Sequence, residues 1–254
     1  MKRILIILGG LLGLGVLAVL AVVAIQLLRS DDPNLATEAP LIPTAAAGPG
    51  VDQAPASALP TATAAAASLP AGVLRFVIDP AQSSAKYVVR ETLRGIETNA
   101  VGETKDGPSP DVAGELLLTR TGLHTAQRSS FKVDLRTLTS DESLRDSFIK
   151  RDTLRTGQFP HAEFVITSVS GFPASYVENS QVELSLSGDM TIRGSTKPVM
   201  FKVLARQAGD TLTATADADF KMSDFGITPP EVPFAKARDE IHLQVVLVAK
   251  QQSS

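Results

Sequence analysis

The chain has 254 residues, a formal net charge of -3 and no cysteine. The absence of cysteine excludes disulfides, zinc sites built on thiolates, thiol catalysis and lipoprotein anchoring through cysteine. Three basic and four acidic residues lie in residues 1–72, so the remainder has a balance of -2. This near neutrality provides no electrostatic footprint for nucleic acid.

The N-terminus begins with a long apolar segment. Lys2 and Arg3 precede residues 4–28, in which Gln26 is the only strongly polar side chain. A helix of this length extends about 37 Å, which exceeds the roughly 30 Å hydrocarbon core of a bilayer. We therefore predict a transmembrane signal-anchor helix at 1–29 and a single-pass protein of the cell membrane. The positive-inside rule places its N-terminus in the cytoplasm and the rest of the chain outside, in the periplasm or at the cell surface.

Two alternatives concern this segment. Ala18, Ala21 and Ala24 could form a small-x-small cleavage site, so that the segment would be a removable signal peptide. Gly9 and Gly13 have the small-xxx-small spacing that allows membrane helices to pack closely, and they suggest a weak dimerisation face.

Residues 30–72 form the next compositional unit. Residues 36–72 contain fourteen alanines, six prolines and no aromatic residue. Recurrent proline prevents a stable helix, and the apolar side chains are too few for a core. We predict a disordered Ala/Pro-rich linker between the span and a domain at 73–254.

The domain is dominated by alternation of apolar and polar residues, which is typical of β-strands. The clearest row directs Leu212, Ala214, Ala216, Ala218 and Phe220 to one face, and Thr211, Thr213, Thr215, Asp217 and Asp219 to the other. Similar rows include Ala85, Tyr87, Val89; Phe131, Val133, Leu135; Val182, Leu184, Leu186; and Ile241, Leu243, Val245, Leu247, Ala249. About eight to ten such strands in succession predict an antiparallel sandwich or barrel.

Two intervals depart from this pattern. Residues 140–155 have near-helical spacing of Leu144, Phe148 and Leu154, and we predict a short helix capped by Ser140 that covers one mouth or side of the barrel. Residues 225–234 contain three prolines, which predicts an unusually apolar extended loop.

An ordered set of short motifs is similar to the YceI-like family of lipid- or polyisoprenoid-binding domains, over residues 74–250. The motifs are FVIDP at 76–80, RD at 151–152, FP at 159–160, AEF at 162–164, GDMTIRG at 188–194, TKPV at 196–199, SDFGI at 223–227 and DEI at 239–241. The resemblance implies an extended, lipocalin-like antiparallel β-barrel of about eight strands. It also implies an extracytoplasmic location and a lumen that holds an isoprenoid chain.

The predicted ligand is therefore an isoprenoid lipid or quinone, and no cofactor is required. We predict that the lumen is lined by Tyr87, Val89, Phe131, Val133, Phe148, Phe164, Leu184, Phe201, Ala214, Ala216, Phe220, Phe225 and Val245. The small alanines would leave space along one wall. In the alternative interpretation they pack under bulky neighbours such as Phe131 or Phe201, and the interior is filled.

Neither catalysis nor metal binding is predicted. The histidines His124, His161 and His242 lack the spacing of metal ligands, and no nucleophile elbow occurs. A charged cluster of Arg145, Asp146, Arg151, Asp152 and Arg155 suggests surface ion pairs or, alternatively, a contact with a lipid head group. The predicted function is non-enzymatic binding or carriage of an apolar chain near the membrane. A surface-displayed interaction module with a filled core is the alternative.

Overall fold

The computed structural model describes residues 35–42, 72–104, 111–119, 122–124 and 128–252. The predicted span at 1–29 and most of the predicted linker lie outside these residues. Among the residues that the structure describes, no helix has the length and apolarity needed to cross a membrane.

Within the described residues, thirteen strands form a single sheet, and all of them pair antiparallel. They are β1 Leu74–Ile78, β2 Ser84–Leu93, β3 Ile96–Thr104, β4 Val112–Thr119, β5 Gly122–Leu123, β6 Ser130–Asp134, β7 Leu138–Ser140, β8 His161–Ser170, β9 Val182–Ile192, β10 Ser195–Ala208, β11 Thr211–Lys221, β12 Glu231–Val232 and β13 Ala235–Gln252. The helical elements are the short α-helix α2 Ser143–Phe148, the π-helical turn η3 Ile149–Thr153, and the 3-10 turns η1 Pro80–Gln82, η2 Leu135–Thr137 and η4 Met222–Phe225.

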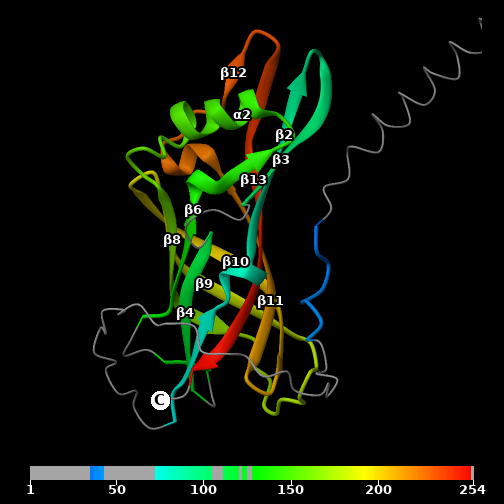
Figure 1. Cartoon of the computed structure of the whole chain (residues 1–254), viewed down its shortest axis with the longest axis vertical. Helices are drawn as coiled ribbons and strands as arrows, with labels where there is room; N and C mark the ends of the chain where they lie inside the picture. Colours follow the sequence, from blue (N-terminus) through cyan, green and yellow to red (C-terminus); the bar gives the residue numbers. More distant parts are fainter. Residues whose placement is uncertain (1–34, 43–71, 105–110, 120–121, 125–127, 253–254) are drawn as a thin grey trace, which may run out of the picture.

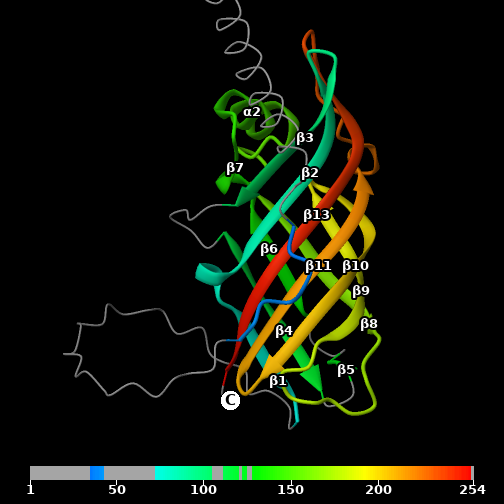
Figure 2. The same ribbon diagram turned by 90° about the vertical axis from the view of Figure 1, so that its right-hand side faces the viewer.

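Eight of the strands close into a barrel. The order β1-β4-β6-β8-β9-β10-β11-β13 returns to its start because β13 also pairs with β1, with Phe76 opposite Gln251. Closure leaves these strands without an open edge. The prediction of an antiparallel barrel of about eight strands with one short helix is confirmed (Figures 1 and 2).

The barrel is extended at one end because β13 has 18 residues, more than one neighbour can cover. Its last residues pair with β1, and its residues 235–246 pair with β2. From β2 the sheet continues through β3 to β7. The turns of the β2–β3 and β12–β13 hairpins project beyond α2, and we call this end of the barrel the hairpin end (Figure 2).

The inner face follows the alternation expected for a half-buried sheet. Ala214, Ala216 and Ala218 of β11 are buried inside the barrel, as predicted. The rings of Phe164 and Phe201 pack edge to face with centroids 4.9 Å apart, a favourable arrangement for aromatic pairs. Side chains from every strand of the ring meet in one hydrophobic core.

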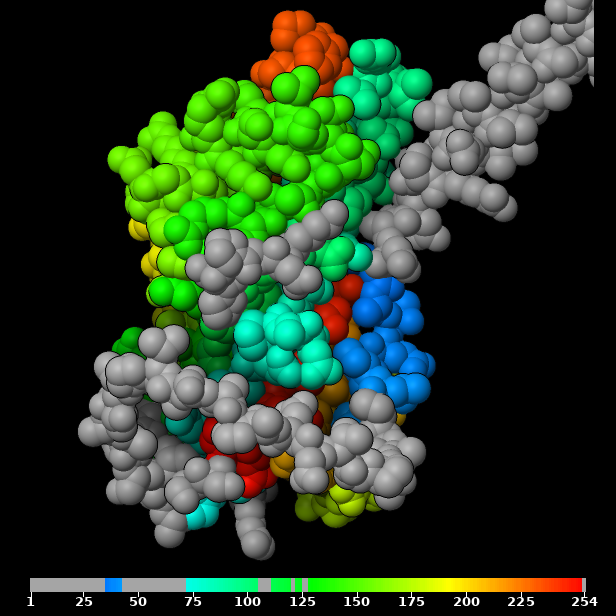
Figure 3. Space-filling model, in the orientation of Figure 1, coloured from blue at the N-terminus to red at the C-terminus, as the bar shows by residue number. Residues whose placement is uncertain are grey.

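Part of the outer face of β11 and β13 is covered: Thr213, Thr215 and Gln244 are buried there, whereas Asp219 is exposed. Residues 35–42, which we call the strap, lie across it as an extended segment between the two flanking stretches of predicted linker (Figure 3). Thr215 donates a hydrogen bond to the carbonyl of Glu38 (2.8 Å), and Thr213 donates one to that of Pro40 (2.7 Å). Residues 35–42, which lie within the predicted linker, therefore have hydrogen-bond partners for their backbone on the barrel wall.

The helical interval begins later than predicted. Ser140 ends β7, and Glu142 caps α2 by accepting a hydrogen bond from the backbone N–H of Leu144 (3.1 Å). Ser140 pairs with Gly102 of β3, and its backbone N–H donates a hydrogen bond to the side chain of Asp146 (2.8 Å). It therefore belongs to the strand that precedes the helix and is not the helix cap. The expected apolar helix face is also wrong at Leu144, which is exposed, whereas Leu154 packs against the core.

The interval 225–234 is only partly the extended apolar loop that was predicted. Phe225 ends the 3-10 turn η4, and both Phe225 and Ile227 are buried in the core. The short strand β12 pairs back onto β13. Only Phe234, at the turn that follows β12, remains a large exposed apolar residue.

Candidate functional site

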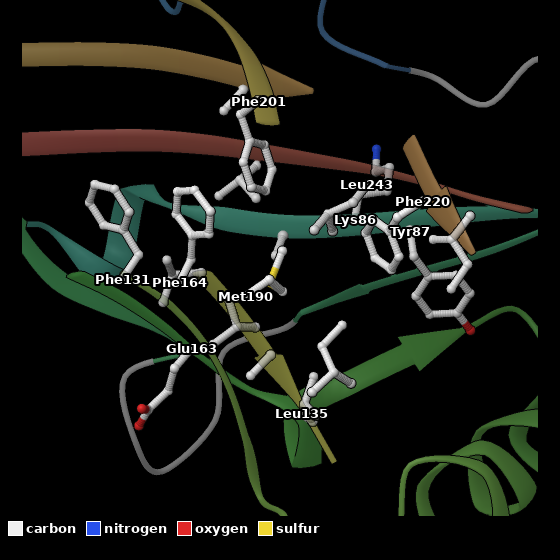
Figure 4. A pocket seen from close by; sticks show the side chains of 18 of the residues that line it. Lys86, Tyr87, Phe131, Leu135, Glu163, Phe164, Met190, Phe201, Phe220 and Leu243 are labelled. Carbon is white, nitrogen blue, oxygen red and sulfur yellow. The ribbon is translucent and has the colours of Figure 1, made fainter. Parts of the chain in front are cut away.

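The candidate site is an apolar cavity inside the barrel, with an open volume of about 150 Å³. Aromatic and aliphatic side chains of the inner strand faces form most of its wall (Figure 4). An engineered cavity of similar size in another protein stays dry and admits one benzene molecule. The interior is therefore neither completely filled nor wide enough for a long chain without some movement of its side chains.

Nine of the thirteen predicted lumen residues lie on the cavity wall. They are Tyr87, Phe131, Val133, Phe164, Phe201, Ala216, Phe220, Phe225 and Val245. Their strands bring together residues that are up to 158 positions apart in sequence. Whether they contact a ligand stays a prediction.

The other four predicted residues lie elsewhere. Val89 and Ala214 are buried in the core next to the cavity, and Leu184 packs against that core from a partly exposed position. Phe148 lies in α2 and is not part of the cavity wall.

Several wall residues were not predicted. They include Met190, Leu154, Met222, Ile227 and Leu138. Ile227 lies in the predicted loop 225–234, Met222 begins the 3-10 turn η4 just before it, and Leu154 follows a π-helical turn. Met190 could have been found, because it alternates with Ile192 on one face of a strand.

Tyr87 brings a polar group to one end of the cavity. Its ring packs against Gly102 on β3, where a side chain would collide with the ring. Burial raises the pKa of the phenol, although Arg145 acts in the opposite direction, so the hydroxyl stays neutral. In Figure 4 this hydroxyl points away from Phe164 and Phe201, towards the helical segment.

An ion pair beside Tyr87 stabilises the junction of α2 with the barrel. Arg145 lies 2.9 Å from Glu91 of β2, and both side chains are largely buried. Burial by itself lowers the pKa of Arg145, but Glu91 and Asp141 outweigh it and the pKa is raised. Together with the Asp146–Ser140 and Arg151–Asp152 contacts, this pair confirms the structural interpretation of much of the charged cluster.

The charged residues at the cavity wall are paired on the outer side of the barrel. Lys86 lies 3.7 Å from Glu103, and Glu163 lies 3.2 Å from Lys132. The charge of each is therefore compensated by its ion-pair partner.

The histidines do not assemble a metal centre. Within the described ranges, no group of three or more histidine and carboxylate side chains comes close enough to hold a metal ion. His242 faces outward, as predicted, and its imidazole contacts Asp219 at 2.8 Å and Asp217 at 3.2 Å.

Comparisons with known proteins agree with this fold. The family model described as "YceI-like domain" matches residues 76–249. A UPF0312 protein of Pseudomonas putida (strain W619) is 31% identical over 113 residues, and one of Shewanella sp. (strain W3-18-1) is 30% identical over 134 residues. These matches cover 41% and 48% of the chain, and they span 55% and 63% of the two relatives.

Two solved structures share the barrel at low sequence identity. BcnA of Burkholderia cenocepacia has a TM-score of 0.52 and 19% identity, over 68% of this chain and 99% of BcnA. A structure described as a polyisoprenoid binding domain from Saccharophagus degradans, implicated in plant cell wall breakdown, has a TM-score of 0.54 and 10% identity, over 70% of this chain and 99% of that domain. At these identities the likeness concerns the fold alone.

Proposed function

Because the chain belongs to the YceI-like domain family, we propose that it is a membrane-tethered binding protein that holds an apolar chain inside its barrel. The ligand class is a polyisoprenoid or an isoprenoid quinone. The observation that carries this proposal is the apolar cavity inside the closed barrel. The description of the Saccharophagus degradans structure as a polyisoprenoid binding domain supports the same ligand class.

The cavity chemistry favours binding by desolvation. Burying about ten methylene equivalents contributes roughly 8 kcal/mol before the costs of association. The present space is too small for such a chain, so side chains must shift to admit it. Met190 and Met222 on the wall are suited to this, because methionine is unbranched and adapts to irregular space.

Binding without catalysis fits the groups on the wall. The described lining is aliphatic and aromatic apart from Tyr87 and the outwardly paired Lys86 and Glu163. A neutral phenol can donate a hydrogen bond to a carbonyl, hydroxyl or phosphate oxygen at the polar end of a ligand. We infer a carrier or buffer of lipid rather than an enzyme.

Tethering is the second part of the proposal. Residues 4–28 have the length and composition of a membrane span. A span would keep the barrel beside the bilayer in which isoprenoid lipids reside, outside the cytoplasm. Two such spans would pack against each other through the face that contains Gly9 and Gly13.

The test compares the full chain with the variant Ala216→Phe. Ala216 lies on the cavity wall, so an added ring should occupy the open space while leaving residues 1–72 unchanged. Both proteins are purified from the membranes of a lipid-replete host, and their lipids are extracted and identified by mass spectrometry. We expect an isoprenoid species enriched in the unaltered chain and at least tenfold depleted in the variant. Equal isoprenoid content would contradict binding in the lumen.

A further inference from the structure

The strap is held in a defined direction on the barrel wall. Gln244 of β13 accepts a hydrogen bond from the backbone N–H of Ala36 (2.7 Å) and donates one to its carbonyl (2.9 Å). Further along, the carbonyl of Glu38 accepts from Thr215 and that of Pro40 accepts from Thr213. β11 runs from Thr211 towards the hairpin end (Figure 1). The strap runs in the opposite direction, so Ala36 lies nearest the hairpin end and Pro40 lies farther from it.

Side-chain contacts reinforce this attachment. The backbone N–H of Ala39 donates to Gln181 (3.3 Å), and Ala39 is almost completely buried. Glu38 lies 3.6 Å from Arg206 of β10. The strap therefore contacts three neighbouring strands or their flanks, which sets its position relative to the barrel.

This attachment limits how far the barrel can lie from a membrane span at 1–29. Arg29 and Ala36 are seven residues apart, and a fully extended chain bridges about 23–25 Å over that separation. Gln244 is nine residues from Ala235 at the hairpin end, about 30 Å along β13. With the usual strand tilt of about 35–45°, that is roughly 21–25 Å along the barrel axis. The end of the span can therefore just reach the level of the hairpin end.

The hairpin end presents side chains suited to a bilayer surface. Ile96 of the β2–β3 hairpin is 65% exposed, Phe234 of the β12–β13 hairpin is 60% exposed, and Leu144 of α2 is 77% exposed. The two hairpins are adjacent, because the backbone N–H of Arg94 donates to the carbonyl of Phe234 (2.7 Å). Beside these apolar tips the charges are paired, Lys236 with Glu231 and Arg238 with Glu97, so the tips match the boundary between acyl chains and polar head groups.

The cavity also approaches this end. Phe225, Ile227, Leu138 and Leu154 belong to the segments around η4, β7 and η3, and all of them line the cavity. A barrel with its hairpin end on the bilayer would therefore hold this part of the lumen next to the lipid phase.

We propose that the strap fixes the barrel with its hairpin end against the bilayer, with Ile96 and Phe234 inserted at the lipid interface. The proposal rests on the tethering part of the proposed function and not on the identity of the ligand. The opposite end, where Val177 is 70% exposed, faces away from the membrane.

The experiment uses the full chain reconstituted in vesicles of phosphatidylethanolamine and phosphatidylglycerol. Because the chain has no cysteine, Ile96→Cys, Phe234→Cys and Val177→Cys each provide one labelling site for an environment-sensitive fluorophore. Quenching by lipids that carry a spin label in the acyl chain reports contact with the bilayer. We expect at least twofold stronger quenching at positions 96 and 234 than at position 177.

Three results would overturn the proposal. Quenching at position 177 that equals or exceeds quenching at 96 and 234 would show another orientation. Flotation of the protein with the vesicles but no quenching at 96 or 234 would show that the hairpin end does not touch the membrane. Failure to float would refute the tether, whereas ligand binding is judged separately by the Ala216→Phe extraction.

A strap variant completes the test. Gln244→Ala combined with Thr215→Val removes three hydrogen bonds to the strap and leaves the predicted span intact. The difference in quenching between the two ends should fall by at least half. An unchanged difference would show that the strap does not determine the orientation.

Discussion

The two faces of the β11–β13 wall, the inner one and the part of the outer one beneath the strap, are covered by different chemistry. The inner face presents Ala216, Val245 and Leu247 to an apolar cavity. The outer face presents Thr213, Thr215 and Gln244, which bind the backbone of the strap. The alternation along one strand therefore separates a surface suited to an apolar chain from a surface suited to an extended peptide.

The comparison shows that an outward-facing polar side chain need not be a solvated one. Thr215 is fully buried, although it points away from the core. Its hydroxyl satisfies a carbonyl of the strap, which would otherwise carry the cost of an unpaired buried group. The following experiments separate the contributions of the two faces.

The largest effect is expected on the inner face, for Phe164→Ala. Phe164 is buried and packs edge to face on Phe201, so the variant should lose about 3–5 kcal/mol in its free energy of unfolding. Urea unfolding followed by far-UV circular dichroism measures this loss. The enlarged cavity should retain isoprenoid lipid in those molecules that stay folded. A loss below about 1 kcal/mol would mean that the interior adapts more readily than the packing suggests.

A smaller effect is expected at the junction of α2 with the barrel, where Arg145 pairs with Glu91 of β2. Arg145→Met leaves Glu91 buried without its partner at 2.9 Å. Removing one member of such a pair should cost about 3 kcal/mol, at the lower end of the usual range because Arg145 retains some exposure. Thermal unfolding in vesicles measures the shift. The exposed pair at Arg151 provides the control, and Arg151→Gln should leave the unfolding midpoint unchanged.

On the outer face, Gln244→Ala should release the strap and leave the barrel folded. The variant removes two hydrogen bonds to Ala36, each worth about 1 kcal/mol. Hydrogen exchange of the amides in residues 35–42 should accelerate roughly tenfold or more. Thr196→Val is the matched control, because Thr196 contacts Thr191 on the same sheet and does not touch the strap. Equal acceleration in both variants would contradict a specific attachment.

The smallest effect is a pH dependence that arises outside this wall, at Asp134 at the end of β6. The hydrogen bond from Arg136 lowers the pKa of the buried Asp134 below its ordinary value of 3.8. The stabilisation is therefore present above pH 3.8, and it is lost as the pH falls through the lowered pKa. Asp134→Asn should flatten the loss of stability below pH 4 relative to the unaltered chain. Parallel acid unfolding curves would contradict this contribution.

The barrel and part of its lining could be predicted from the residues. Period-two rows such as Ala214, Ala216 and Ala218 place side chains on one face, because successive side chains alternate across a strand. Phe131 belongs to such a row, and Phe164 belongs to a family motif. The wall residues in irregular segments, such as Ile227 and Leu154, have no comparable period and could not be predicted in this way.

The strap illustrates why other features were missed. Its sequence, LATEAPLI, lies in an Ala/Pro-rich stretch with no period of its own. The sequence of β11, which the strap contacts, does contain a sign of this contact. Its outward-facing residues Asp217 and Asp219 are charged, whereas Thr213 and Thr215 are not. That change indicates a covered surface, but it does not identify which segment covers it.

The sequence by itself determined the strand faces, the antiparallel class and the apolar segment at the N-terminus, because these follow from local spacing and composition. Only the tertiary structure decided the size of the cavity, the pairing of Arg145 with Glu91 and the attachment of the strap. Each of these depends on contacts between residues far apart in the chain. Closure of the barrel brings such residues together, and local propensity contains no information about the resulting distances.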